Sequence, residues 1–292
     1  MKNLFEHASS YWVRYDGYEC RRTADGQEYV LPAPDARPQP YDPMRDAEKL
    51  VVDALNVGML CMNEADDKEI KKAVLEFVSR YGLLGLMTAI PTTPTFMEYD
   101  AVYLLKNPFI RDEVMDTDAY LALFQPFDKL RIVKKGKESR WNLTDRMMIA
   151  LALTFGEKPM AQQMCFMREY GERYDWIKTQ FKDWAFAFCS SLLYYDSHDD
   201  LDEETRNLYR MGMAAFDGIA PSYHIELREK PTIVWDYHSL LLAIQMMFSF
   251  ILTNEKRPLK LCLNCQKAFL ANRPNMVFCS PQCRKKYGNR RG

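Results

Sequence analysis

The sequence predicts an α+β protein with a mainly helical body, a small N-terminal β unit and a C-terminal four-cysteine module. Three observations predict this arrangement. Apolar residues recur at helical spacing over much of the chain. Two strand-like runs lie near the N-terminus, and the second contains the turn signal Asp25-Gly26. Residues 256–292 contain four of the eight cysteines and ten Lys and Arg, but no Asp or Glu.

The N-terminal segment, residues 1–43, is expected to be a β unit followed by a proline-rich arm. The runs YWVRYDG and YECRRTADGQEYVL have the composition of strands, and Asp25-Gly26, within the second run, is a hairpin turn signal. Five prolines follow between positions 32 and 43. Because proline fixes φ and lacks an N–H, this spacing forbids a helix and favours an extended arm.

The middle segment, residues 44–255, is expected to be a mainly helical domain with a few strands. Asp66 and Glu69 resemble a capping box at a helix start, and the segments SYHIELRE and TIVWDY read as strands. Within residues 95–140, the run MEYDAVYLL fits a strand or a short helix, and KKGKESR fits a solvated loop. Helices are predicted over residues 44–62, 142–156, 159–195, 200–216 and 237–254, and a further helix is predicted to follow the Asp66 cap and to include the run KKAVLEFVSRYG, residues 71–82.

The C-terminal segment, residues 256–292, has the cysteine spacing of a metal site. Cys262 and Cys265 form one pair, and Cys279 and Cys283 form a second pair after a 13-residue gap. Zinc binds four soft ligands at tetrahedral corners, and two short cysteine pairs supply four thiolates. Ser280 fits the cap of a short helix that holds the second pair. Pro281 suits the first turn of that helix, Gly288 suits its end, and Phe269 and Phe278 are expected to cover the metal.

Three other interpretations of these cysteines fit the sequence less well. Four unrelated thiols do not explain two short pairs in one segment. A redox C-x-x-C motif needs a βα context without a second cysteine pair nearby. A catalytic zinc keeps an open coordination position, whereas four thiolates leave none. The sequence therefore predicts one structural Zn²⁺, with no catalytic residue.

Charge is divided unevenly along the chain. The formal net charge of −1 combines +10 in residues 256–292 with −11 in the rest. Four thiolates and one Zn²⁺ would lower the charge of the C-terminal segment to about +8. A polyanion such as nucleic acid would therefore meet this segment, mainly through its phosphates and independently of sequence. The residues expected to contact nucleic acid are Lys267, Arg273, Arg284, Lys285, Lys286, Arg290 and Arg291.

The same cations also fit a solvated surface, or a patch that docks on the acidic body or on a partner protein. No secretory signal is visible at the N-terminus, and the longest apolar stretch, residues 239–252, is too short to span a bilayer. We therefore expect a cytoplasmic protein without a membrane partner. The remaining cysteines are expected to be free thiols in a reducing compartment; they are Cys20, Cys61, Cys165 and Cys189.

The motif CLNC-x3-F…FCSPQC…GNRR resembles the C-terminal treble-clef zinc fingers of bacterial proteins, in particular the CGNR type. In this chain the residues RKKY lie between Cys283 and Gly288. The resemblance, to this type or to a related uncharacterised bacterial family, implies a treble-clef fold, four cysteine ligands and a role in transcription regulation.

No nucleotide-binding, metalloprotease or hydrolase motif is present in the sequence. His224 and His238 lie beside aromatic and acidic residues, which is typical of hydrogen-bonded structural histidines. The leading hypothesis is therefore a non-enzymatic, zinc-dependent nucleic-acid-binding protein, most simply DNA-binding and regulatory. A protein-interaction module is the alternative, and an enzyme with an unrecognised active site in the helical body is a third possibility.

Overall fold

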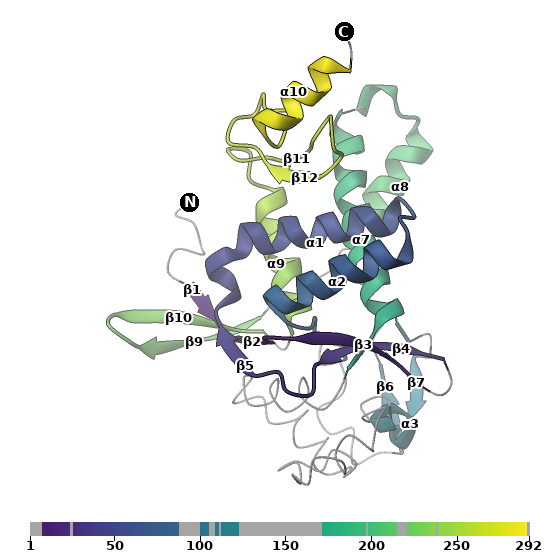
Figure 1. Cartoon of the computed structure of the whole chain (residues 1–292), viewed down its shortest axis with the longest axis vertical. Helices are drawn as coiled ribbons and strands as arrows, with labels where there is room; N and C mark the ends of the chain where they lie inside the picture. The colour runs from purple at the N-terminus through teal and green to yellow at the C-terminus, as the bar shows by residue number, and fades with distance from the viewer. Residues whose placement is uncertain are drawn as a thin grey trace. The chain divides into compact units, whose positions relative to one another are not determined.

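The computed structural model shows a mixture of helices and short strands, which confirms the mixed α and β character expected from the sequence (Figure 1). The chain divides into two compact units, each built from three stretches of sequence. Unit 1 comprises residues 1–45, 78–177 and 221–242, and unit 2 comprises residues 46–77, 178–220 and 243–292. The predicted division at residues 43 and 255 stays a prediction. The structure describes residues 8–23, 26–87, 100–104, 109–110, 112–122, 171–196, 198–214, 221–237 and 239–290.

The described residues of unit 1 form four small sheets. Their strand orders are β1-β10-β9, β2-β5, β3-β4-β8 and β6-β7. The unit also contains the short helices η1 (Pro43–Asp46) and α3 (Thr117–Ala122), although Asp46 already belongs to unit 2. The strands are β1 (Ala8–Ser10), β2 (Trp12–Tyr15), β3 (Tyr18–Arg22), β4 (Glu28–Pro32), β5 (Pro38–Tyr41), β6 (Ala101–Tyr103), β7 (Val114–Asp116), β8 (Glu172–Arg173), β9 (Ser222–Leu227) and β10 (Pro231–Asp236).

The predicted N-terminal hairpin is confirmed. Strands β3 and β4 pair antiparallel from Tyr18↔Pro32 to Arg22↔Glu28. Gly26 has φ of +86°, a value that glycine adopts without steric cost, while Asp25 lies outside the described residues. Part of the proline-rich arm is extended, as expected: Pro38–Tyr41 form β5, which pairs antiparallel with β2. Residues 33–36 instead form a turn, in which the N–H of Ala36 donates to the carbonyl of Ala33 at 3.0 Å, and Pro43 begins η1.

A buried carboxylate organises the core of unit 1. Glu172 accepts hydrogen bonds from the backbone N–H groups of Leu84, Gly85 and Leu86, at 3.0, 2.5 and 3.0 Å. Burial raises the pKa of Glu172 to about 7, although these three N–H donors act in the opposite direction. Gly82, just before these N–H donors in the chain, has φ of +86° and lies against the indole ring of Trp12. The indole N–H of Trp12 donates to the carbonyl of Leu83 at 3.1 Å.

Unit 2 contains most of the helical core and the C-terminal finger. At Gly58, α1 approaches α7 so closely that a Cβ would lie 2.1 Å from the carbonyl oxygen of Phe181. The ring of Phe181 packs edge-on against the rings of Phe77 and Trp184, with ring centres 4.8 and 5.6 Å apart, respectively. Residues of α2, α7 and α9 are divided between the two units. The helices are α1 (Ala47–Met62), α2 (Asp67–Tyr81), α7 (Tyr174–Asp196), η3 (His198–Asp200), α8 (Glu203–Ala214), α9 (Leu240–Leu252) and α10 (Pro281–Asn289).

The predicted helices at residues 44–62, 200–216 and 237–254 correspond to α1, α8 and α9, and the helix predicted after the Asp66 cap corresponds to α2, with small differences at their ends. The predicted helix over residues 159–195 is wrong at residues 172 and 173, while residues 159–170 lie outside the described residues. Glu172 and Arg173 form strand β8, which pairs with β4, and α7 begins only at Tyr174. The predicted helix at residues 142–156 lies outside the described residues. None of the described helices combines the length and apolar character needed to cross a bilayer.

Candidate metal centre

The first cysteine pair lies in the turn of a short antiparallel hairpin. Strands β11 (Leu259–Leu261) and β12 (Ala268–Leu270) pair in register from Leu259↔Leu270 to Leu261↔Ala268. The N–H of Cys262 donates to the carbonyl of Lys267 at 2.9 Å, and the N–H of Gln266 donates to the carbonyl of Cys262 at 2.8 Å. Gln266 has φ of +56°. This tight turn directs both cysteines of the pair to the same side.

The second cysteine pair spans the start of α10, as the sequence predicts. Ser280 is extended, with φ of −155°, and its hydroxyl accepts a hydrogen bond from the N–H of Cys283 at 3.2 Å. This is the expected N-cap, and Pro281 follows it in the first turn. Cys279 therefore lies just before the helix, and Cys283 lies within its first turn.

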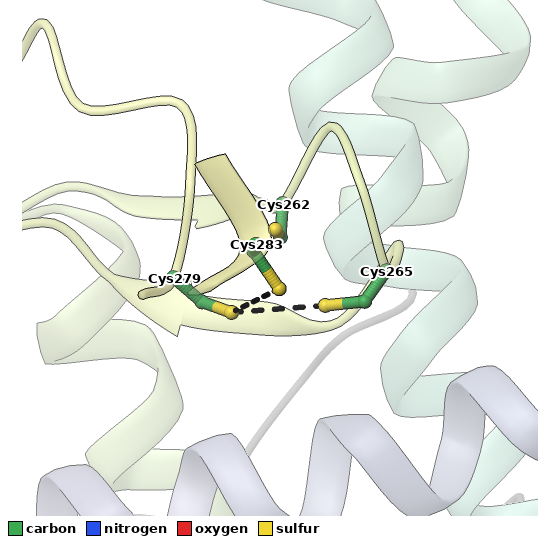
Figure 2. Close-up of side chains that lie close together, drawn as sticks. All are labelled: Cys262, Cys265, Cys279 and Cys283. Carbon is green, nitrogen blue, oxygen red and sulfur yellow. Dashed lines mark hydrogen bonds between the residues drawn. The ribbon is translucent and has the colours of Figure 1, made fainter. Parts of the chain in front are cut away.

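The four cysteine sulfurs converge on one point (Figure 2). The Sγ atom of Cys279 lies 3.7 Å from that of Cys265 and 3.6 Å from that of Cys283, and all four Sγ atoms lie within 4.8 Å of one another. Four sulfurs bound tetrahedrally at ~2.3 Å from one ion would lie roughly 3.8 Å apart, whereas a disulfide needs ~2.0 Å. The cysteines are free thiols with the spacing of a tetrahedral metal site.

Apolar side chains cover one side of the cysteine cluster. Cys262 and Ala271 are fully buried with Phe269, and Met276 and Phe278 pack against them. The ring of Phe278 also contacts that of Tyr287, with ring centres 5.2 Å apart. The predicted cover by Phe269 and Phe278 is therefore present. Cys279 is exposed, so the site is buried on one side and open to solvent on the other.

The thiols of the cluster have divided acidities. Burial acts to raise the pKa of Cys262, but backbone N–H groups of Cys279, Cys265 and Asn264 donate to its sulfur and lower the pKa to about 6. Burial raises the pKa of Cys265, and burial together with the neighbouring sulfurs raises the pKa of Cys279 to about 12. The Ser280 hydroxyl lowers the pKa of Cys283. A metal ion therefore has to displace protons from this cluster.

Helix α1 anchors the finger through a contact that sequence reasoning missed. Asn56 donates to the carbonyl of Ala268 at 3.1 Å and accepts from its N–H at 2.8 Å. In an antiparallel ladder, hydrogen-bonded and non-hydrogen-bonded residue pairs alternate. Because the N–H of Cys262 donates to the carbonyl of Lys267, the next pair, Leu261 and Ala268, is not hydrogen-bonded, and the N–H and C=O of Ala268 point away from β11. Asn56 thus takes the place of a neighbouring strand. Nothing in the sequence near Asn56 indicates a partner 212 residues away.

A second contact joins the finger to α1. The guanidinium of Arg257 lies 2.5 and 2.7 Å from the two carboxylate oxygens of Glu48. The side chains are less than half exposed, at 43% and 46%. Glu48 was also not expected from the sequence. The strand side of the finger is therefore fixed on α1 by one neutral and one charged contact.

The predicted nucleic-acid-binding cations lie on the other parts of the finger. Among the residues that the structure describes, none of them forms an ion pair, and all six described members are exposed. Arg291 lies outside the described residues. The six are Lys267, Arg273, Arg284, Lys285, Lys286 and Arg290.

The predicted helix end at Gly288 is wrong. Helix α10 continues through Asn289, and the N–H of Arg290 bonds back to the carbonyls of Tyr287 and Gly288. A Cβ at Gly288 would meet no atom within 4 Å. Gly288 and Asn289 extend the helix up to its C-cap residue, Arg290, which increases the length of the basic surface.

The remaining candidate residues do not assemble a second metal site within the described chain. Burial raises the pKa of Cys61 to about 11 and also raises that of Cys189, so both are inert thiols. Cys20 is a half-buried free thiol, and Cys165 and His238 lie outside the described residues.

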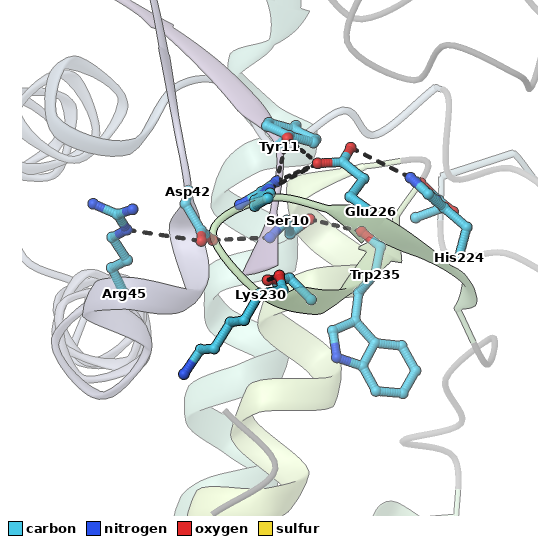
Figure 3. Close-up of polar contacts among 11 residues, drawn as sticks. Ser10, Tyr11, Asp42, Arg45, His224, Glu226, Lys230 and Trp235 are labelled. Atoms are coloured by element: carbon cyan, nitrogen blue, oxygen red, sulfur yellow. Dashed lines mark hydrogen bonds and ion pairs between the residues drawn. The ribbon is translucent and has the colours of Figure 1, made fainter. Parts of the chain in front are cut away.

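His224 lies on the surface strand β9, where both ring nitrogens face carboxylates (Figure 3). Nδ1 lies 2.8 Å from Asp236, and Nε2 lies 3.4 Å from Glu226. The Asp236 hydrogen bond raises the pKa of His224. With neither nitrogen directed at a nucleophile, this geometry is that of a surface ion-pair network.

Comparison of the chain with protein-family models, with curated proteins and with solved structures finds no match. The site therefore has to be interpreted from its own geometry. Its defining feature is a compact set of four cysteine sulfurs that can hold one metal ion.

Proposed function

We propose that the chain is a non-enzymatic nucleic-acid-binding protein whose C-terminal finger is held together by one structural Zn²⁺. Four thiolates favour zinc over the hard cations magnesium and calcium, and they leave no position for a reacting water. The order of hairpin, C-x-x-C turn, loop and helix is that of a treble-clef finger and supports the resemblance to the CGNR type.

The observation that carries the nucleic-acid assignment is the unpaired basic surface of the finger. Six exposed cations have no ion-pair partner within the described residues, although the chain has 40 acidic side chains. The contact between the finger and α1, within unit 2, uses Arg257 and none of these six cations. The cations on α10 therefore remain available for phosphate groups.

This surface favours binding to the phosphate backbone over reading of bases. Helix α10 has nine residues, and three of its seven exposed residues are Arg or Lys. Such side chains release counterions from nucleic acid and give affinity that depends weakly on sequence. A regulatory role, and DNA rather than RNA as the target, rest on the CGNR resemblance.

A salt titration with a random-sequence duplex of about 20 base pairs tests the proposal. If about five cations meet phosphates, the slope of log affinity against log salt is roughly −4 to −5. The triple variant Arg284→Glu, Lys285→Glu and Lys286→Glu should lose measurable binding and keep its zinc.

The matched control makes the same charge change on exposed helix positions outside the finger. In this control the lysines Lys68, Lys72 and Lys182 are replaced by glutamate. The control variant should bind within about threefold of the wild type, with most of the salt slope retained. Equal loss of affinity in the two triple variants would show a net-charge effect. Unchanged affinity in the α10 variant would favour the protein-interaction alternative.

A further inference from the structure

Strand β9 forms an open edge of a small sheet in unit 1. The strand order is β1-β10-β9, and within the described residues no strand pairs with the outer side of β9. An edge strand presents unpaired backbone N–H and C=O groups, which can template pairing with another strand. This edge is independent of the finger and of its proposed function.

The two faces of β9 differ sharply in character. Tyr223, Ile225 and Leu227 alternate along one face and are 63%, 64% and 87% exposed. The cross-strand neighbours Ile233 and Trp235 lie on the same face, and Ile233 is 39% exposed. An apolar surface this open on a sheet edge is a site where association lowers the exposed apolar area.

The opposite face carries alternating charges. His224 and Glu226 point to this side, with the Trp235 ring on the other (Figure 3). Their side chains are 49% and 32% exposed. Glu226 accepts from Arg228 at 2.8 Å and from the Tyr11 hydroxyl at 3.0 Å, which fixes its carboxylate near the edge.

We propose that β9 pairs antiparallel with β9 of a second copy of this chain, with the two-fold axis at Ile225. In this register, Ile225 faces its own counterpart, and Tyr223 faces Leu227 of the second copy. His224 faces Glu226 of the second copy, and the symmetry repeats this pair. Directly opposite residues share a face in antiparallel sheets, so the apolar and charged faces of the two copies remain aligned.

The charges select this register over its neighbours. An axis at Glu226 would place two glutamates opposite each other and His224 opposite Arg228. An axis at His224 would place two histidines opposite each other. Of the axes at His224, Ile225 and Glu226, only the Ile225 axis pairs opposite charges twice within Ser222–Leu227, and self-complementarity of this kind is what a two-fold dimer interface requires. This charge pattern identifies a second copy, rather than an unrelated strand, as the partner.

A single strand pair buries less area than a standard interface, so the dimer is expected to be weak. Sedimentation velocity over chain concentrations of about 1 to 500 μM therefore tests the proposal. The zinc-loaded full chain should show a reversible monomer–dimer equilibrium. The variant Glu226→Lys should weaken the dimer by about tenfold or more, since His224 would then face a lysine. His224→Glu should weaken it similarly, by opposing two glutamates.

An equal mixture of the two variants provides the decisive measurement. The lysine introduced at position 226 of one chain then faces the glutamate introduced at position 224 of the other. The remaining His224 faces the remaining Glu226, so the dimer should reappear as a heterodimer. Glu229→Lys makes the same charge change at the exposed hairpin tip, outside the paired residues, and should leave the wild-type dimer unchanged. Far-UV circular dichroism confirms that each variant is folded.

Three results would overturn the proposal. The first is a wild-type chain that stays monomeric at the highest concentration. The second is a dimer that is as strong in the Glu226→Lys and His224→Glu variants as in the wild type, which would place the contact elsewhere. The third is a mixture of the two folded variants that stays monomeric, which would show that the His224–Glu226 register does not exist.

Discussion

Replacing Asn56 by alanine tests how the finger is held on α1. The side-chain amide makes two hydrogen bonds to the backbone of Ala268, at 2.8 and 3.1 Å. Ala268 is only 2% exposed, so water has little access to its N–H and C=O once the amide is removed. An unsatisfied buried polar group costs roughly 1–3 kcal/mol. With partial relaxation, Asn56→Ala should lower the free energy of unfolding by about 2–4 kcal/mol.

Urea unfolding of the zinc-loaded chain, followed by far-UV circular dichroism, measures this change. Asn56→Asp serves as a diagnostic variant, because its carboxylate can accept from the N–H of Ala268 but repels the carbonyl oxygen; it should also be destabilising. Asn275→Ala, in an exposed turn of the finger, is the matched control and should change stability by less than about 0.5 kcal/mol. A loss of less than about 0.5 kcal/mol for Asn56→Ala would refute the anchoring role.

Three further outcomes are expected. Gly58→Ala should lower the unfolding free energy by about 3 kcal/mol or more, because the new Cβ would lie 2.1 Å from the carbonyl oxygen of Phe181. A melting temperature equal to that of the wild type would contradict the close approach of α1 and α7. The pKa of Glu172 in the folded state, about 7, lies above its unfolded value near 4.5. The contribution of Glu172 to folding stability is therefore fully present below pH 4.5 and is lost as the pH rises through 7. Glu172→Gln should remove about 3 kcal/mol of the change in unfolding free energy between pH 4.5 and 7, as measured by urea titrations at each pH. If the unfolding free energy of the variant depended on pH as that of the wild type does, Glu172 would be ionised in the folded protein throughout this range. Zinc affinity in a competition assay should increase steeply from pH 6 to 8, because binding at neutral pH displaces about two or three thiol protons; a flat profile would contradict the divided acidities of the cluster.

The features that sequence predicts well are local ones. Ser280 and Pro281 define the start of α10 because an N-cap and a first-turn proline act within a few residues. The hairpin around Gly26 follows from one glycine with positive φ. The cluster of four cysteines was identifiable because metal chemistry restricts both the identity and the spacing of the residues that can hold an ion.

The features that sequence misses depend on tertiary contacts. Strand β8 is only two residues long and exists because it pairs with β4, so the helical pattern around it gives no sign of a strand. Asn56 reads as an ordinary helix residue until Ala268 is placed beside it. Gly288 is compatible with a helix end, yet α10 continues through Asn289, and nothing in the structure explains the difference.

Zinc K-edge X-ray absorption on the intact, reduced chain, combined with elemental analysis, tests the metal centre most directly. We expect one zinc per chain and a first shell of four sulfurs at ~2.3 Å. A chain that contains no stoichiometric metal after purification under reducing conditions, or a shell in which nitrogen or oxygen replaces sulfur, would contradict the four-cysteine site.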